Sequence, residues 1–548
     1  MFQFTGQYAA GTLKQAGGVA LYIAEFISQF YRVIGIGPVL TALLLTGVAV
    51  LTARIVQIIS TRNDLFFASL LPWAALFILH LDYYYLEQGT VAYLLLLLFL
   101  ALYARLKPAG RLLYGICIIP VLYVIAGPAA FLFAVCALLV DFLTPGNRKY
   151  RAFLYLLVAI ACGIAGTYLG YSRDLKYAFL PDAYYDPLSH ASTIYFAWYA
   201  LPVTLLAAAF LRKYKEPVTS KGKWVWEGFQ AIAILFLLYQ GVLRYGQLET
   251  APHLKQDYYI RNEQWDRVIA EFDRNKPSKR RMCNLNLALA YKGELAERLL
   301  EFPQGGIETL MLRWDQSVFT AQQHSDLYYC MGIISTAQKF AFEAFVSSHP
   351  SGNPRMLKRL VETNLAMGAY AAAEKYIALL ENTWHYREWA ASRRPFLYND
   401  AAVEKDKSLG LKRRCWQAET ANGRLYKDPV SSLTDLVQAC PQNRAGLQYL
   451  TSFLLLNKDI DTYRALYQKL YRTPAWPEMS TCQQEAVVVS NPDDPHYWLE
   501  HGVSLKVRNR SLAFMEKVKA NARNSNLPAM LAADFGTTYW FYYMFYNK

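Results

Sequence analysis

Two short polar segments contain the side chains best suited to chemistry. The segments HLDYYYLEQG, residues 80–89, and FLPDAYYDPLSH, residues 179–190, both combine carboxylates, a histidine and adjacent tyrosines. A carboxylate can abstract a proton or bind a metal ion, and a tyrosine ring can stack on a sugar, so the pattern could form a site for a lipid-linked sugar. The candidate acids are Asp82, Glu87, Asp182 and Asp186, and the candidate binding residues are His80, Tyr83, Tyr84, Tyr85, Tyr184, Tyr185 and His190.

The same tyrosines have a second interpretation. Tyrosine is favoured at the level of the lipid headgroups, where its ring meets the apolar core and its hydroxyl meets water. The two segments could then be ordinary turns at the membrane surface with solvated acids. The two interpretations differ in whether the acids converge on one cavity or are spread around the rim.

Long apolar runs surround both segments. The chain has 548 residues, 54% of them hydrophobic, and a net charge of +14. From Ile34 to Val242, apolar runs of about 15 to 24 residues alternate with short charged or Gly/Pro turns, which is typical of membrane-spanning helices. From Gln247 onward charges recur every few residues, as in a water-soluble domain. The predicted spans are 34–57, 64–80, 89–105, 111–126, 129–143, 152–170, 193–212 and 225–243.

One pair of these spans could instead be a single helix. A helix over 111–143 would contain Pro120 and Pro128 and would exceed the hydrocarbon thickness, whereas in a hairpin each arm would be short. Basic clusters lie on both sides, at Arg105, Lys107 and Arg111 and at Arg148, Lys149 and Arg151. Both clusters face the cytoplasm only if an even number of crossings separates them, so the sequence predicts a hairpin.

Alternate loops are basic along the whole apolar region. The basic loops contain Arg54 and Arg62, the two clusters above, and a last set between Arg212 and Lys223. The loop 81–88 has no Lys or Arg, and the loop 171–192 has only two. Because basic loops face the cytoplasm, the two tyrosine segments and the region after the eighth span are expected outside it.

Residues 1–33 are then expected outside the cytoplasm as well. They lack a basic segment followed by an apolar one that could carry them across. We expect either that a further helix precedes Met1 in the intact protein or that this short tail crosses by itself. In the first case residues 1–33 form the first extracytoplasmic loop, and VALYIAEFISQF is predicted to be an amphipathic helix at the membrane surface.

Residues 246–548 have the pattern of short paired helices. NLNLALAYKGELAERLL, VETNLAMGAYAAAEKYIALL and YLTSFLLLNKDIDTYRALYQKL each place a turn, at Gly293, Gly368 or Asp459, between two helices with apolar faces. This is the unit of a tetratricopeptide-like array, in which neighbouring units bury one another's faces. Further units are predicted around Gln264, at NPRMLKRLVETN and at NPDDPHYWLEHGVSL. Because the turns are not spaced by multiples of about 34 residues, we expect an irregular α-solenoid.

Other features narrow the function. No Gly-rich loop ends in Gly-Lys-Ser/Thr, so the sequence does not predict ATP-driven transport. The order of His496, Glu500 and His501 does not match the zinc proteases, and we predict neither a metal site nor a cofactor. The basic runs NKPSKRRM and LKRRCW are expected to be solvated, and nucleic acid is not expected as a partner outside the cytoplasm.

Two features of the soluble region concern its packing. The aromatic end TTYWFYYMFY, residues 537–546, is predicted to form the capping helix of the array. The five cysteines of this region allow at most two disulfides, and their spacing selects none. We therefore expect buried free thiols.

Two families share features with this chain. QAGGVALYIAEFISQFY, LDYYYLEQGTVAYLLLLL, LYVIAGPAAFLFAVCALL and TTYWFYYMFY together resemble an uncharacterised family of polytopic membrane proteins from Bacteroides-like bacteria. That resemblance covers nearly the whole chain and implies a tetratricopeptide-like region after the membrane domain, usually with one more helix at the start. A weaker resemblance is to multi-span glycosyltransferases that use lipid-linked sugars. Those enzymes usually have an acid in the first extracytoplasmic loop, which adds Glu25 as a candidate.

Together these features predict an all-α protein. We expect an extracytoplasmic or interfacial segment over 1–33, a membrane domain of about eight spans over 34–245, and an extracytoplasmic helical-repeat domain over 246–548. The first functional hypothesis is a scaffold in the cytoplasmic membrane whose repeat domain binds an envelope protein. The second is a glycosyltransferase or related enzyme that acts on a lipid-linked sugar. Membrane lipid is a partner in both, and a transporter is disfavoured because the spans carry almost no charge.

Overall fold

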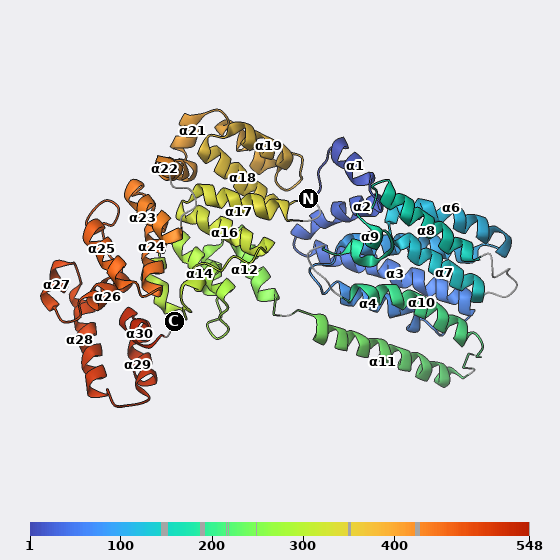
Figure 1. Cartoon of the computed structure of the whole chain (residues 1–548). Helices are drawn as coiled ribbons and strands as arrows, with labels where there is room; N and C mark the ends of the chain where they lie inside the picture. Colours follow the sequence, from blue (N-terminus) through green and yellow to red (C-terminus); the bar gives the residue numbers. More distant parts are fainter. Residues whose placement is uncertain are drawn as a thin grey trace. The chain divides into compact units, whose positions relative to one another are not determined.

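The computed structural model describes residues 1–143, 152–186, 192–214, 216–217, 219–247, 249–348, 352–421 and 428–546. Within these ranges the regular secondary structure is helical and no β-strand is found, which confirms the all-helical prediction. The chain forms two compact units, Met1–Leu248 and Glu249–Lys548 (Figure 1). The predicted basic cluster at 148–151, Lys215 and His190 lie outside the described ranges.

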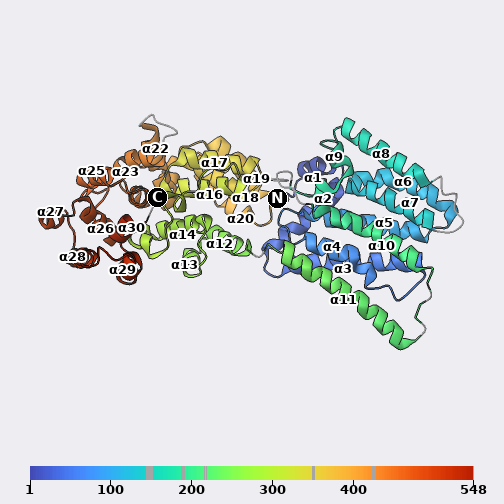
Figure 2. The same cartoon turned by 60° about the horizontal axis from the view of Figure 1, so that its bottom comes forward.

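The first unit contains the apolar helices. Its α-helices are α1 (Gly6–Leu13), α2 (Gly18–Ser28), α3 (Ile36–Ser60), α4 (Leu71–Leu79), α5 (Glu87–Arg105), α6 (Pro108–Ala126), α7 (Ala129–Leu143), α8 (Phe153–Tyr168), α9 (Leu175–Phe179), α10 (Ile194–Leu211) and α11 (Ser220–Tyr245). Helix α5 packs against α2, α3, α6 and α7, so that its Leu96, Leu97 and Leu100 are fully buried. Helix α11 lies at the edge of the unit beside α4 (Figures 1 and 2).

Five of these helices, α3, α5, α6, α10 and α11, are long and apolar enough to cross a membrane. The other three predicted spans correspond to shorter apolar helices, over Ala68–Leu79, Ala129–Leu143 and Phe153–Tyr168. The predicted span 152–170 is shortened because Gly170 adopts φ +74 just beyond α8, a left-handed conformation that ends a helix. The first unit therefore contains helices suited to association with a membrane.

The chain breaks into two helices where the hairpin is predicted. Gly127 adopts φ +70 and its N–H donates to the carbonyl of Tyr123 at 2.9 Å, while Pro128 has no N–H with which to extend α6. A Cβ at Gly17 would lie 3.1 Å from the Gly127 nitrogen, so the start of α2 is in close contact with this break. Helix α2 also buries Ala20 and Ala24 in the core of the unit.

The second unit consists of shorter helices. They are α12 (Ala251–Arg261), α13 (Trp265–Ala270), α14 (Lys279–Lys292), α15 (Leu295–Arg298), α16 (Val318–Met331), α17 (Ile334–Val346), α18 (Pro354–Met367), α19 (Tyr370–Glu381), α20 (Arg387–Ala391), α21 (Asp400–Lys405), α22 (Lys407–Ala421), α23 (Pro429–Ala439), α24 (Arg444–Leu456), α25 (Ile460–Leu470), α26 (Thr481–Ser490), α27 (Pro495–Glu500), α28 (Leu505–Ala520), α29 (Leu527–Phe535) and α30 (Tyr539–Phe545). Successive helices pack on one another, as α16, α17, α18 and α19 do (Figure 1).

Six helix ends among the described residues of this unit share one cap geometry. At Gly332, φ is +87, and the N–H of Ile333 donates to the carbonyl of Tyr328 at 2.9 Å. This is the Schellman motif, in which one left-handed residue turns the chain sharply after a helix. The same positive φ and backbone bond occur with Glu263, Gly293, Gly368, Lys458 and Gly502 as the left-handed residue. Each cap joins two helices, and the segment NPRMLKRLVETN belongs to α18, the first helix of the pair that turns at Gly368, rather than to a separate unit.

The aromatic end packs against other helices of the second unit. Helix α30 contacts α26 and α29 and buries Tyr539, Trp540 and Tyr542. The Tyr539 and Tyr542 hydroxyls donate to the carbonyls of Leu455 and Leu456, each at 3.0 Å. These bonds satisfy carbonyls at the end of α24 that have no partner within the helix.

Candidate functional site

The two tyrosine segments of the first unit lie side by side. Tyr85 and Tyr185 form an isolated antiparallel bridge. The N–H of Leu86 donates to the carbonyl of Tyr184, and the N–H of Asp186 donates to the carbonyl of Tyr84, both at 3.0 Å. The segments 80–89 and 179–186 therefore form one polar region.

Within this region Asp82 and Asp182 are acceptors of hydrogen bonds from other residues of the unit. Asp82 accepts from the hydroxyl of Tyr185 and from the N–H of Tyr84 at 3.0 Å. Asp182 accepts from the hydroxyl of Tyr195 at 2.5 Å and lies 2.7 Å from Lys176 Nζ. Burial opposes ionisation of Asp182, but the bonds from Lys176 and Tyr195 lower the pKa of its carboxyl below the usual value. Both carboxylates thus hold neighbouring segments together.

His80 and Glu87 form a more buried group with two hydroxyls. His80 Nε2 lies 2.8 Å from the hydroxyl of Thr90, which lies 3.1 Å from the hydroxyl of Tyr85. His80 Nδ1 lies 3.7 Å from Glu87 Oε2, and the two side chains are only 15% and 8% exposed. Among the described residues Glu87 Oε1 has no hydrogen-bond partner. A buried carboxylate beside an imidazole is a pair that could move a proton.

Gly89 allows Tyr85 and Tyr184 to pack closely against the start of α5. A Cβ at Gly89 would lie 2.5 Å from the Tyr85 hydroxyl and 2.9 Å from the Tyr184 Cβ, which is closer than real contacts. The Tyr184 hydroxyl donates to the carbonyl of Ala126 and accepts from the N–H of Ala129 at 3.0 Å, so it bridges the break between α6 and α7. Tyr184 is therefore a packing residue of the unit.

Other predicted residues lie apart from the His80–Glu87 pair. Tyr83 and Tyr84 are 53% and 36% exposed. Glu25 is buried on α2, where it interacts with the amino group of Met1. His190 lies outside the described residues. The sequence analysis did not predict roles for Thr90, Lys176 and Tyr195. Thr90 could have been included because it directly follows the segment 80–89.

Comparison with known proteins gives one match. A family model described as a family of unknown function (DUF6057) matches residues 1–546. Neither the curated proteins nor the solved structures gave a match.

Proposed function

The chain belongs to this family of unknown function, and from its own residues we propose that it is an integral scaffold protein of the cytoplasmic membrane. In this proposal the first unit anchors the chain, and the second unit is a tetratricopeptide-like domain outside the cytoplasm. The second unit binds a protein of the cell envelope.

The membrane anchor is supported by the lengths of the apolar helices. Five of them reach the length of a span, and the three shorter helices complete the eight crossings of the proposal if the bilayer thins locally or if flanking turns enter the headgroup region. The basic loops at alternate connections favour an even number of crossings. An even number leaves the end of α11, and with it the second unit, on the side where the chain started.

The repeat domain is supported by the recurring cap geometry, which is the observation that carries this proposal. Gly293, Gly332 and Gly368 follow one another at intervals of 39 and 36 residues, close to the period of about 34 residues in tetratricopeptide arrays. Each of these three caps joins two packed helices, and buried residues of the three pairs, such as Leu289, Leu327 and Ala366, lie in one core. Arrays of this kind serve as binding surfaces for other proteins without needing catalytic residues.

The bonds of the acidic residues favour the scaffold over an enzyme. Asp82 and Asp182 each accept a tyrosine hydrogen bond that joins parts of the first unit, which is a structural use of a carboxylate.

One observation favours the second candidate, a glycosyltransferase or related enzyme that acts on a lipid-linked sugar. The Glu87 carboxylate is buried next to His80 and keeps one oxygen without a hydrogen-bond partner among the described residues, as a general base would.

Co-purification with genetic rescue separates the two candidates. Full-length protein is cross-linked in native membranes, purified in mild detergent and compared with Glu87→Gln, which keeps the size of the side chain and removes its charge. Glu516→Gln, an exposed change on α28, is the matched control. If the protein is a scaffold, the native protein, Glu87→Gln and Glu516→Gln should all co-purify with the same envelope protein in stoichiometric amount. All three should also fully rescue a deletion strain. Loss of rescue by Glu87→Gln at normal abundance, with accumulation of lipid-linked sugar, would overturn the scaffold and support the enzyme.

A further inference from the structure

A small polar cavity lies within the second unit. Its volume is about 210 Å³, and residues of α12, α13, α14, α16, α18 and α22, with the turn before α13, line it. Four of the lining residues are basic, namely Arg261, Arg355, Lys358 and Arg359. So many cations around one small space require either neighbouring carboxylates or an anionic ligand.

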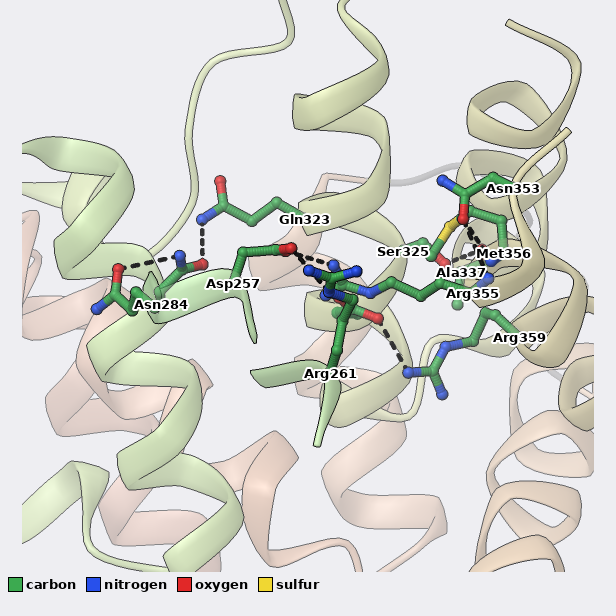
Figure 3. Close-up of polar contacts among 12 residues, drawn as sticks. Asp257, Arg261, Asn284, Gln323, Ser325, Ala337, Asn353, Arg355, Met356 and Arg359 are labelled. Carbon is green, nitrogen blue, oxygen red and sulfur yellow. Dashed lines mark hydrogen bonds and ion pairs between the residues drawn. The ribbon is translucent and has the colours of Figure 1, made fainter. Parts of the chain in front are cut away.

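The three arginines have carboxylate partners. Arg355 lies 2.5 Å from Asp257 and also binds Asp326. Arg359 lies 3.0 Å from Asp326, and Arg261 lies 2.9 Å from Asp257 (Figure 3). These ion pairs connect α12, α16 and α18, so they fix the walls of the cavity. Their charges largely cancel.

Arg359 is also held by an aromatic ring. Its guanidinium carbon lies 3.7 Å from the ring centroid of Tyr329, and its second terminal nitrogen lies 2.9 Å from Glu362. The guanidinium is therefore oriented before any ligand arrives. A site formed in advance loses little conformational entropy on binding.

Lys358 is different from the arginines. Its ammonium lies 4.7 Å from the ring centroid of Trp389 and has no carboxylate within 4.0 Å among the described residues. Lys358 is half-buried. Burial lowers the pKa of its ammonium, although Glu362 and Glu263 act in the opposite direction. Lys358 is therefore the cation of the lining that has no direct ion-pair partner among the described residues, so its ammonium can bind a ligand carboxylate. The carboxylate of Glu263 also lines the cavity and offsets the charge of Lys358 at longer range, which favours a monoanion over a dianion.

One wall of the cavity is aromatic. Trp265 and Tyr291 stack with their ring centroids 4.4 Å apart and their planes at 8°. Ile260 and Leu287 add apolar surface, and Glu263 and Ser408 add hydrogen-bonding groups. An apolar wall with a few polar groups is typical of sites for small organic molecules. The volume lies below the range of about 300 to 1,000 Å³ for drug-sized ligands, so the ligand is about the size of a single sugar ring.

We propose that this cavity binds a small hydroxylated carboxylate of the size of one uronic acid. The carboxylate lies against Lys358, the ring lies against the Trp265–Tyr291 wall, and the hydroxyls bond to Glu263 and Ser408. This site goes beyond the proposed scaffold role and does not depend on it.

Calorimetry on the full-length protein in detergent tests the site, with sodium glucuronate as the probe. We expect one glucuronate per chain and binding at least tenfold weaker for glucose, which has the ring without the carboxylate. Lys358→Gln is expected to weaken glucuronate binding at least tenfold. Lys358→Arg, which keeps the charge, should bind within a few-fold of the native chain, and Lys375→Gln, an exposed change on α19, should leave binding unchanged.

Several results would overturn the proposal. These are no heat with millimolar glucuronate, equal binding by the native chain and Lys358→Gln, or tighter binding of inorganic phosphate than of glucuronate. Since Lys358→Gln could disturb folding, the midpoint of thermal unfolding is measured for each variant. If Lys358→Gln unfolds, Lys358→Met, which keeps the alkyl chain on Trp389, replaces it with the same expected loss.

Discussion

The Tyr185 hydroxyl donates a hydrogen bond to the Asp82 carboxylate, and so joins two loops that are far apart in the sequence. The backbones of the same loops pair through Tyr85 and Tyr185. The residues that look most chemical in the sequence therefore contribute to the packing of the first unit. In the second unit, six helix pairs among the described residues share one turn geometry.

The bond between Tyr185 and Asp82 gives a stability prediction. Tyr185→Phe removes the donor and should lower the free energy of unfolding of the first unit by about 1.5 to 3 kcal/mol, the usual range for a hydrogen bond to a charged group. Tyr83→Phe is the control, because Tyr83 is 53% exposed. Thermal unfolding of the purified protein in detergent measures both, and equal midpoints for the two variants would contradict the structural role of this bond.

Two glycines at the helix caps of the second unit should differ in their tolerance of a methyl group. Both Gly293 and Gly332 have positive φ, so alanine costs about 1 to 2 kcal/mol of backbone strain at either position. At Gly293 the new Cβ meets nothing within 4 Å, whereas at Gly332 it would lie 2.5 Å from Asn443 Nδ2 and 3.0 Å from Cys415 Sγ. Overpacking should destabilise Gly332→Ala by about 1 to 3 kcal/mol more, and should not affect Gly293→Ala. Proteolysis in increasing urea should rank this variant well below Gly293→Ala, and the reverse order would refute the cap geometry.

Two buried thiols are placed to form a disulfide that the sequence could not select. Cys415 Sγ lies 3.3 Å from Cys440 Sγ. The hydrogen bond from Cys415, together with the positive charges of Arg414 and Lys412, lowers the pKa of the Cys440 thiol below its ordinary value although burial opposes this, so Cys440 is the thiol of the pair that ionises first.

Oxidised glutathione is the reagent that tests this pair. Cys440 displaces one reduced glutathione to form a mixed disulfide, and Cys415 then displaces the second. Peptide mass spectrometry should find one Cys415–Cys440 link and a free Cys283 thiol. The link should be absent from Cys440→Ser, and a link between other cysteines instead would contradict this placement.

Glu485 should make stability depend on pH. Burial raises the pKa of Glu485 to about 7, although its carboxylate accepts a bond from the N–H of Tyr539 at 2.7 Å. The unfolded chain ionises this carboxyl first, near its ordinary value of 4.5, so stability is lost as the pH rises from there to about 7. The loss amounts to about 3 kcal/mol above pH 7, at about 1.4 kcal/mol for each unit of pKa difference.

Glu485→Gln keeps an acceptor for Tyr539 and removes the ionisation. It should leave the unfolding midpoint almost unchanged at pH 5 and raise it at pH 8 relative to the native chain. Glu516→Gln, an exposed change, should follow the native chain at both values. If the native chain is as stable at pH 8 as Glu485→Gln, ionisation of Glu485 does not lower the free energy of unfolding.

Sequence patterns predicted the helical class because apolar periodicity is a local property. The turns at Gly293 and Gly368 were also visible, since each glycine follows an apolar helix, whereas the turn predicted at Asp459 has its left-handed residue at Lys458. Gly332 was missed because the residues after it, Ile333 and Ile334, are apolar like those before it, although one left-handed residue is enough to turn the chain. The three shorter apolar helices were predicted as full spans because hydropathy does not mark where a helix stops.

The functional candidates depended on contacts that no local pattern records. The sequence could not tell that Asp82 and Tyr185 bond to each other, or that His80 and Glu87 lie together in the interior. The cavity beside Lys358 was not predicted at all, because the residues that line it come from separate helices and pair with acids elsewhere in the chain. Such a site is formed by tertiary packing alone.

The most direct test of the central claim asks on which side of the membrane the second unit lies. Lys375→Cys on α19 and Lys107→Cys before α6 each introduce an exposed cysteine, and both are treated in intact spheroplasts with a maleimide that cannot cross the membrane. Lys375→Cys should be labelled at once, and Lys107→Cys should be labelled only after lysis. Labelling of Lys375→Cys only after lysis would put the second unit in the cytoplasm and would contradict a scaffold for envelope proteins.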